Sequence, residues 1–195
     1  AVLKDGALYG RFESILVGEH NLYNQVAMVA ALDRYGLSTE ELAAGFSSFA
    51  GVRRRQDLIG EPRHIAVIDD FAHHPTAVEL TIESLRLRFG QRRLWVIFEP
   101  RSNTSRRKVF QDRYAEVFGG ADVVIIPTPP DQERIAAHER FDADALVQKL
   151  RAKGSEAFHL PTVDEIVAVV AANALPWAGV AVFSNGCFGG IHQKL

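Results

Sequence analysis

The sequence has almost no cysteine and no long apolar segment. Cys187 is the single cysteine among 195 residues, which excludes a disulfide within the chain and suits a reducing compartment. No apolar run approaches the roughly 20 residues that a transmembrane helix needs, and the first residues lack the basic and apolar regions of a signal peptide. We therefore expect a cytoplasmic protein with no membrane partner. Because the chain begins at Ala1 without a methionine, we expect it to be a piece of a longer protein.

A strong charge of either sign is also missing. The net charge is −2 and the isoelectric point is about 6.4, whereas a general nucleic-acid binder is usually basic, so we expect no nucleic-acid partner. Hydrophobic residues make up 47% of the chain and charged residues 24%, which is the balance of a soluble globular protein with a packed core. The length predicts one large domain, or one domain with an additional fragment.

The common phosphate-binding and metal-binding motifs are absent. The chain contains neither G-x-x-x-x-G-K-[ST] nor G-x-G-x-x-G, and the glycines at 186–190 are too loosely spaced for a dinucleotide fingerprint. If the protein handles a nucleoside triphosphate, the phosphate cradle therefore lies elsewhere. His73 and His74 have no partner at zinc-ligand spacing, so we expect no protein-only metal site. A nucleophilic Cys187 is a minor alternative, because a lone cysteine is more often a small buried apolar residue.

Apolar strands alternate with amphipathic helices after Gly51. This alternation predicts an α/β fold with a mainly parallel sheet and helices on both of its faces. The run Ile65–Ile68 predicts one buried strand, and the pattern from Thr76 onward predicts the helix that follows it. The expected strands are 56–60, 65–68, 93–98, 122–126, 156–159 and 179–183, and the expected helices are 76–88, 105–118, 142–152 and 162–173.

The first part of the chain has a different organisation. Residues 1–17 alternate apolar and polar positions between glycines, which predicts a hairpin. Helices are expected at 22–35 and 39–49, with no strand between them. We therefore divide the chain into a first segment, 1–50, and a Rossmann-like domain, 51–195.

Three polar clusters follow predicted strands directly. Asp69 and Asp70 come after the strand at 65–68 and share one strand-to-helix turn with His73, while two further clusters begin at Glu99 and Ser184. The carboxyl ends of parallel strands lie at one edge of an open sheet, where ligands usually bind. We expect the three clusters to converge there. A purely structural interpretation stays open, because an aspartate before a helix is often only a cap.

The basic run Arg53-Arg54-Arg55 has two interpretations. A run of like charges is by default a solvated surface turn. Arginines can also bind an anion, either phosphate or carboxylate, through paired hydrogen bonds. Nothing in the neighbouring sequence decides between these two interpretations, so both stay open at this point.

Five motifs, spread in order over about residues 18–192, resemble those of the Mur ligase family. This family comprises the ATP-dependent amide-forming ligases of peptidoglycan assembly. Each motif alone is modest, and their order makes the resemblance specific. The motifs are His20-Asn21-x-x-Asn24, Gly51-Val52-Arg53-Arg54-Arg55-Gln56-Asp57, Asp69-Asp70-Phe71-Ala72-His73-His74-Pro75-Thr76, Glu99-Pro100-Arg101-Ser102-Asn103-Thr104-Ser105-Arg106 and Ser184-Asn185-Gly186-Cys187-Phe188-Gly189-Gly190-Ile191-His192.

The resemblance implies a parent protein of three domains. The first binds a UDP-sugar, the central one is a P-loop ATPase, and the third closes on the nucleotide and receives the incoming amine. On this basis residues 1–50 are the end of the central domain and residues 51–195 are the third domain. The remaining domains of the polypeptide are then partners of this chain. Since the phosphate cradle and metal ligands belong to the central domain, we expect no catalytic or metal-binding residue here, and no activity from the chain alone.

The resemblance also implies roles for individual residues. An amide side chain can both donate to and accept from an adenine edge, and a carboxylate can accept from ribose hydroxyls, whereas Asp69 is expected to be structural. The nucleotide-binding candidates are Asn21, Asn24, Arg55, Asp70 and His73. The candidates for binding the amine substrate are Arg101, Ser102, Asn103, Thr104, Arg106, Ser184 and Asn185. No role is assigned to His74 or Cys187.

Two of the motifs, at 99–106 and 184–192, are most similar to those of family members that act in peptidoglycan recycling. These enzymes join L-alanyl-γ-D-glutamyl-meso-diaminopimelate to UDP-N-acetylmuramate. The resemblance implies ATP and Mg²⁺ as cofactors, and an acyl phosphate on the muramoyl carboxylate that the peptide amine then attacks. One alternative is a ligase that adds L-alanine to the same UDP-sugar. Another is a stand-alone, non-catalytic α/β module that binds nucleotide or peptide.

Overall fold

The structure, a computed structural model, describes residues 1–195 as two compact units, Ala1–Val52 and Arg53–Leu195. The first unit consists of the antiparallel strands β1 (Val2–Lys4) and β2 (Ala7–Gly10) and the helices α1 (Glu19–Arg34) and α2 (Thr39–Ser48). Its small core is built from Val29, Leu42 and Phe46 with partly buried neighbours. The assignment of this unit to a central ATPase domain stays a prediction.

The two helices of the first unit begin at different kinds of cap. Before α2, Ser38 Oγ accepts from Glu41 N at 3.2 Å, and Glu41 Oε2 accepts from Ser38 N at 2.8 Å. This capping box satisfies amide groups that have no partner within the helix. Helix α1 begins at Glu19, earlier than the expected Leu22, after Gly18 with a left-handed φ of 102°. The chain can turn into the helix there because glycine adopts such a φ without steric cost.

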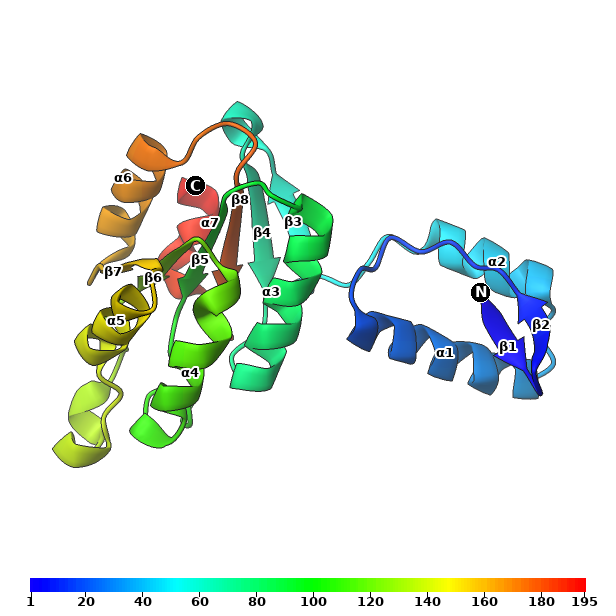
Figure 1. Cartoon of the computed structure of the whole chain (residues 1–195), viewed down its shortest axis with the longest axis horizontal. Coiled ribbons are helices and arrows are strands. Elements are labelled where there is room, and N and C mark those ends of the chain that lie inside the picture. The colour runs from blue at the N-terminus through cyan, green and yellow to red at the C-terminus, as the bar shows by residue number, and fades with distance from the viewer. The chain divides into compact units, whose positions relative to one another are not determined.

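The second unit is a six-stranded sheet between two layers of helices (Figure 1). Its strand order is β3-β4-β8-β5-β6-β7, and only β3 is antiparallel to its neighbour. The strands are β3 (Asp57–Gly60), β4 (Ala66–Asp70), β5 (Leu94–Phe98), β6 (Val123–Ile126), β7 (Glu156–His159) and β8 (Gly179–Phe183). The helices are α3 (Pro75–Phe89), α4 (Gln111–Val117), α5 (Ala143–Ala152), α6 (Val163–Asn173) and α7 (Ile191–Lys194).

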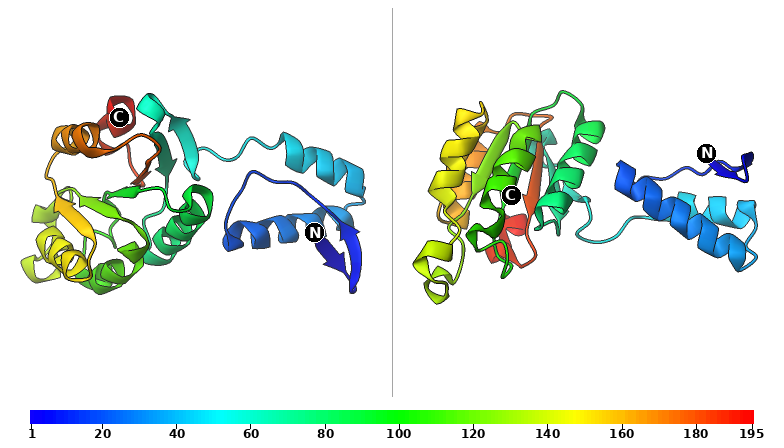
Figure 2. Two further views of the ribbon diagram at one scale, coloured as in Figure 1. Left: turned by 45° about the horizontal axis from the view of Figure 1, so that its top comes forward. Right: turned by 60° about the horizontal axis from the view of Figure 1, so that its bottom comes forward.

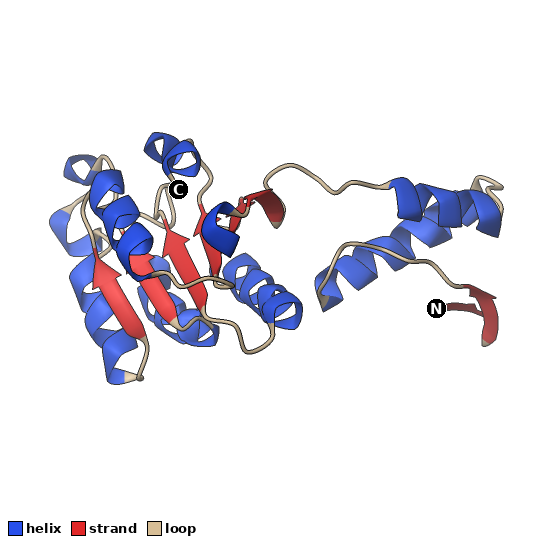
Figure 3. Ribbon diagram, turned by 90° about the horizontal axis from the view of Figure 1, so that it is seen from above, coloured by secondary structure: helices blue, strands red, loops and turns tan.

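Alternate residues of each strand face two separate cores. In β5, Val96 and Phe98 pack with the buried faces of α3, α4 and α5, while Trp95 and Ile97 pack with α6 and α7. The left view of Figure 2 shows the sheet running between these two layers, and Figure 3 shows the helices on both sides of the strands. The prediction of a mainly parallel sheet covered on both faces is therefore confirmed. None of the helices combines the length and the apolar character needed to cross a membrane.

Two local expectations were wrong, and one element was not expected. Asp69 and Asp70 are the last residues of β4, not the start of a turn, because parallel pairing with β8 continues through both of them. Helix α4 begins at Gln111 instead of residue 105, since Arg107 is extended and forms an isolated bridge with Arg140. The short helix α7 had no counterpart among the expected elements.

Candidate functional site

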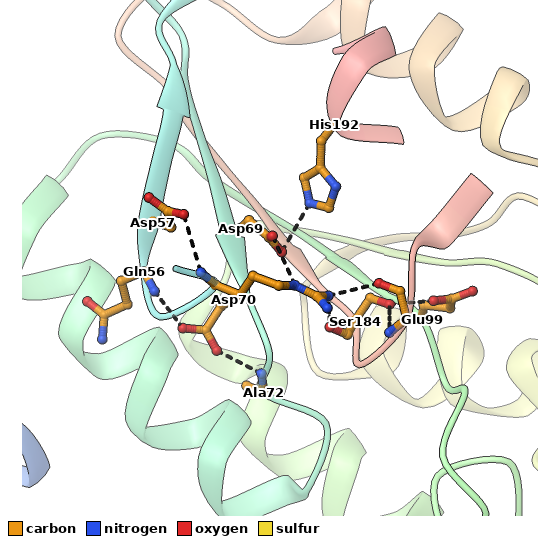
Figure 4. Close-up of polar contacts among 10 residues, drawn as sticks. Gln56, Asp57, Asp69, Asp70, Ala72, Glu99, Ser184 and His192 are labelled. Carbon is orange, nitrogen blue, oxygen red and sulfur yellow. Dashed lines mark hydrogen bonds and ion pairs between the residues drawn. The ribbon is translucent and has the colours of Figure 1, made fainter. Parts of the chain in front are cut away.

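The carboxyl ends of three neighbouring strands lie at the same level of the sheet. Phe183 at the end of β8 pairs with Asp70 at the end of β4 and with Phe98 at the end of β5. The backbone continues this alignment, because Ser184 N donates to Asp70 O and Glu99 N donates to Phe183 O. The three polar clusters that follow these strands therefore meet at one edge, as expected for ligand sites in open α/β sheets. Figure 4 shows the polar contacts at this edge.

Asp70 is buried, and each of its two carboxylate oxygens accepts a hydrogen bond from a backbone amide. Its Oδ1 accepts from Ala72 N at 2.7 Å, and its Oδ2 accepts from Gln56 N at 2.8 Å (Figure 4). Burial raises the pKa of Asp70, and these two amide hydrogen bonds and the charge of Arg55 offset part of that effect. The carboxylate thus joins β4 to the segment before β3. Each of its oxygens still has a lone pair with which to accept a further hydrogen bond.

Asp69 lies on the opposite side of β4 and faces two basic side chains. Its Oδ2 accepts from Arg54 Nε at 3.1 Å. Its Oδ1 lies 3.1 Å from His192 Nε2 (Figure 4), but neither of these two atoms has a hydrogen-bond partner. The Asp69 and His192 side chains are only 8% and 13% exposed. The carboxylate therefore has a charged partner, Arg54, where it is buried, and its structural role stays a prediction.

Arg54 and Glu99 hold the loop that follows β8. Arg54 Nη2 donates to Ser184 O at 2.6 Å and to Gly186 O at 2.8 Å. Ser184 Oγ donates to the buried carboxylate of Glu99 and accepts from Gly186 N at 2.9 Å. Glu99 is 6% exposed and Ser184 is fully buried. This network fixes the backbone of the loop and leaves Ser184 inside it, not on the surface of the edge.

Arg101 is an exposed cation at this edge. Its only ion pair is a long one, from Nη1 to Glu99 Oε1 at 3.4 Å, and 43% of the side chain is exposed. The side chain lies against Gly186, where an added Cβ would come within 2.3 Å of Arg101 Cδ. The glycine therefore makes room for the arginine, and the guanidinium keeps donors free for a ligand.

Arg106 is engaged within the protein instead. Its Nη2 donates to Asn103 Oδ1 at 2.9 Å, and its Nη1 lies 3.3 Å from Pro130 O and 3.4 Å from Asp131 Oδ2. Only 16% of the side chain is exposed. Arg106 thus ties the loop after β5 to the loop after β6. Because Asn103 Oδ1 accepts this hydrogen bond from Arg106, the Asn103 side chain has fewer groups available to a substrate.

The other candidates in the loop after β5 differ in accessibility. Ser102 Oγ accepts from Ser105 N at 3.0 Å and contacts Ser105 Oγ at 2.8 Å, so it stabilises the turn. Thr104 is exposed. Across the edge, Asn185 has a buried Oδ1 with no hydrogen-bond partner. Such an oxygen has lost its contact with water without gaining a partner in the protein.

Arg55 and His73 flank the aromatic ring of Phe71. The Arg55 guanidinium is exposed and lies 5.6 Å from the Phe71 ring centroid. The His73 ring meets Phe71 edge-on at 5.4 Å, and its Nδ1 lies 3.0 Å from Phe71 O. His74 is the N-cap of α3, where its Nδ1 accepts from Thr76 N. Arg55, Asp70 and His73 thus belong to one neighbourhood around the end of β4.

The remaining nucleotide candidates belong to the first unit. Asn21 and Asn24 lie in the first half of α1, three positions apart, so both project from similar sides of the helix. Asn21 Nδ2 donates to Val17 O at 2.8 Å, and Asn24 is exposed. Asn24 has its amide available to a ligand, and Asn21 keeps its carbonyl oxygen available.

Three residues at the edge were missed as individual site candidates. Arg54 was not separated from the other arginines of its run, and Glu99 and His192 were noted only as members of motifs. Their partners lie far away in the chain: Arg54 bonds Ser184 and Gly186 across 130 and 132 positions. No local signal distinguishes Arg54 from Arg53. Glu99 follows a buried strand directly, and that position was the one available clue.

No metal centre is assigned to this chain. No group of three or more histidine, cysteine, aspartate or glutamate side chains is arranged to hold a metal ion. Mg²⁺ prefers near-octahedral oxygen ligands and usually binds with substrate phosphates. We derive no step through a metal here.

Comparison with known proteins defines the class of this chain. Residues 54–186 match the family described as "Mur ligase, glutamate ligase domain", and the chain belongs to this family. Members of the family are ATP-dependent ligases. The matched region covers the sheet, the three polar clusters and most of the second unit.

Individual relatives narrow the comparison. The chain is 38% identical over its whole length to UDP-N-acetylmuramate–L-alanyl-γ-D-glutamyl-meso-2,6-diaminoheptandioate ligase of Escherichia coli, and spans 40% of that protein. It is 33% identical to UDP-N-acetylmuramate–L-alanine ligase of Acetivibrio thermocellus over 90% of this chain and 37% of that one. Among solved structures, a murein peptide ligase from Psychrobacter arcticus is similar with a TM-score of 0.69 and 33% identity, over 94% of this chain and 38% of that one. The chain thus spans about two fifths of the length of these proteins.

Proposed function

We propose that this chain is the C-terminal part of an ATP-dependent ligase that joins L-alanyl-γ-D-glutamyl-meso-diaminopimelate to UDP-N-acetylmuramate. The observation that carries the proposal is the 38% identity to the ligase of this specificity along the whole chain. The motifs after β5 and β8 support it, because they supply the arginine-bearing edge to which an amine substrate with several carboxylates would bind. Residues 1–50 are then the end of the central ATPase domain and 51–195 the third domain.

The second candidate is a ligase that adds L-alanine to the same UDP-sugar. It is supported by the 33% identity to an enzyme of that name over 90% of the chain. The two candidates share the UDP-sugar, ATP and the type of bond formed. They differ in the amine substrate, since L-alanine has one carboxylate and the tripeptide has several. The distinction therefore depends on the edge around Arg101 and Asn185.

The proposed reaction is the formation of an amide through an acyl phosphate. ATP transfers its γ-phosphoryl group to the muramoyl carboxylate, the amine of the peptide attacks the carbonyl carbon, and phosphate leaves as the amide forms. The phosphate cradle and the ligands of Mg²⁺ are proposed to lie in the parts of the protein outside this chain. Catalysis in such a reaction comes chiefly from positioning and from stabilising charge.

The residues of this chain would act by binding and orienting. For the nucleotide we propose Asn21, Asn24, Arg55, Asp70 and His73. The amine substrate would contact Arg101, Thr104 and Asn185 directly, whereas Ser102, Asn103, Arg106 and Ser184 would shape the loops around it. Arginine suits a carboxylate because its planar guanidinium donates two parallel hydrogen bonds. The partners are small molecules and the other domains of the polypeptide, in the cytoplasm.

The proposal is tested with the complete protein that contains this chain. The protein is mixed with UDP-N-acetylmuramate, ATP, Mg²⁺ and the tripeptide, and the product is identified by mass. We expect one amide product, with one ADP and one phosphate released for each product. The isolated chain 1–195 serves as the comparison and should form none. Failure of the complete protein to form the amide would refute the proposed activity, and ligation by the isolated chain would refute the assignment of the phosphate cradle to another domain.

A further inference from the structure

Arg54 connects three segments that are distant in the sequence. Its guanidinium donates to Asp69 at the end of β4, and to the carbonyl oxygens of Ser184 and Gly186 after β8. Arg54 itself belongs to the segment with which the second unit begins. The guanidinium also lies 5.1 Å from the ring centroid of Phe71. One side chain therefore joins the start of the unit, the end of β4 and the loop after β8.

The backbone around Arg54 is held in an unusual conformation. Arg54 has a φ of 59° and Gln56 a φ of 52°, both in the left-handed region that residues other than glycine seldom adopt. Such a conformation persists when surrounding contacts fix it. Here Arg54 O accepts from Phe71 N at 2.9 Å, Arg54 N donates to Asp57 Oδ2 at 3.3 Å, and Gln56 N donates to Asp70. These contacts aim the Arg54 side chain across the sheet edge.

The loop fixed by Arg54 carries the contacts of the accessible arginine. Gly186, whose carbonyl accepts from Arg54, is the residue against which the Arg101 side chain lies. Ser184, whose carbonyl also accepts from Arg54, bonds the Glu99 carboxylate that pairs with Arg101. A shift of the loop would therefore move both surfaces that place the Arg101 guanidinium.

We propose that Arg54 is a positioning residue for the amine-binding edge, acting through Ser184 and Gly186 on Arg101. The inference rests on the proposed function in so far as it names the substrate affected. It separates Arg54 from Arg55, which is exposed beside Phe71 and is a candidate for the nucleotide. Arg54 requires a guanidinium, because its Nε and Nη2 serve three acceptors at once and a lysine ammonium on a flexible stem cannot match that geometry.

The kinetic test uses Arg54→Lys in the complete protein, with Arg88→Lys as the matched control. Arg88 is exposed in the last turn of α3, away from the edge. We expect Arg54→Lys to lower kcat/KM for the tripeptide about tenfold and to leave the KM for ATP nearly unchanged. The control should match the unaltered protein. Equal increases in both KM values would overturn the proposal, because Arg54 would then act on the nucleotide.

A second measurement does not depend on the substrate. Amide hydrogen exchange over residues 184–190 reports whether the loop stays fixed, since Gly186 N is bonded to Ser184 Oγ. We expect exchange there to become at least about tenfold faster in Arg54→Lys and not in Arg88→Lys. Unchanged exchange would overturn the positioning role, whatever the enzyme ligates. Faster exchange in a protein that does not use the tripeptide would refute the proposed function and support the role of Arg54.

A milder variant covers the case in which Arg54→Lys does not fold. Asp69→Asn keeps the size of the side chain and removes the charge that faces Arg54 Nε at 3.1 Å. We expect a smaller change in the same direction in both measurements. An Asp69→Asn protein that folds and matches the unaltered protein in both the exchange and the tripeptide kinetics would overturn the proposal.

Discussion

Replacing Asp70 by asparagine tests how the end of β4 is held. The two backbone amides that donate to the Asp70 carboxylate, Gln56 N and Ala72 N, lie 2.8 and 2.7 Å from its oxygens. Asparagine keeps the shape of the side chain and one acceptor oxygen, and presents an NH₂ group to the other amide. One buried amide therefore loses its acceptor and faces a donor. Asp70 is 2% exposed, so water cannot take the place of the missing oxygen.

The size of the effect follows from these contacts. A buried donor that is left without its acceptor costs about 1–3 kcal/mol. We expect Asp70→Asn to lower the free energy of unfolding by about 2 kcal/mol, because one of the two buried amides then has no acceptor. For a unit of about 140 residues the entropy of unfolding is about 0.3 kcal/mol per kelvin, so the midpoint of thermal unfolding should fall by about 7 °C.

The raised pKa of Asp70 also predicts how the stability difference between the unaltered chain and Asp70→Asn changes with pH. Since the pKa of Asp70 is raised above its ordinary value of 3.8, the folded state keeps its proton in a range where the unfolded chain has lost it. Asp70 thus favours folding most at acid pH, and this contribution falls as the pH rises from 3.8 to the raised pKa. Asparagine does not titrate. The difference in unfolding free energy between the unaltered chain and Asp70→Asn should therefore narrow as the pH rises through that window.

The assay is thermal unfolding followed by circular dichroism at several pH values. Asp164→Asn serves as the control, because the Asp164 carboxylate is 82% exposed in its pair with Lys194, and exposed pairs contribute little. We expect a much smaller shift from the control than from Asp70→Asn. Equal shifts would mean that the two amide hydrogen bonds do not hold the end of β4. A difference that widens with rising pH would contradict the raised pKa.

Other variants test further parts of the edge. Asp70→Asn in the complete protein should raise the KM for ATP more than that for the UDP-sugar; an unchanged KM for ATP would remove Asp70 from the nucleotide site. Arg101→Lys should raise the KM for the tripeptide about tenfold, and Arg106→Lys, whose arginine is engaged by Pro130 and Asp131, much less; the reverse order would exchange their roles. Ser184→Ala leaves the buried Glu99 Oε2 without its donor and should cost about 1–3 kcal/mol in chemical denaturation, and an unchanged midpoint would contradict this.

The sheet and the polar edge at the ends of its strands could be predicted because their causes are local. Apolar runs such as those of β5 and β8 are long enough to identify buried strands, and parallel strands bring their carboxyl ends together wherever they pair. The polar residues after each run then mark the edge. The signal failed at Asp69 and Asp70, since acidic side chains normally end a strand and here the pairing with β8 continues through them.

The roles of individual arginines could not be predicted from local sequence. Arg54 and Arg55 are adjacent and chemically identical, yet one is bonded to residues 130 positions away and the other is exposed. The backbone decides between them, because left-handed φ angles at Arg54 and Gln56 turn successive side chains in different directions. The role of Arg106 could not be predicted from local sequence either, since its partner Asp131 lies in a separate loop.

A competition between the two amine substrates tests the central claim most directly. The complete protein is given UDP-N-acetylmuramate, ATP and Mg²⁺ with equal concentrations of L-alanyl-γ-D-glutamyl-meso-diaminopimelate and L-alanine. The two products differ in mass, and their initial ratio equals the ratio of the two kcat/KM values. We predict that the tripeptide product dominates by at least about tenfold, equivalent to 1.4 kcal/mol in transition-state binding. A mixture in which the L-alanine product dominates would contradict the proposed substrate and favour the L-alanine ligase.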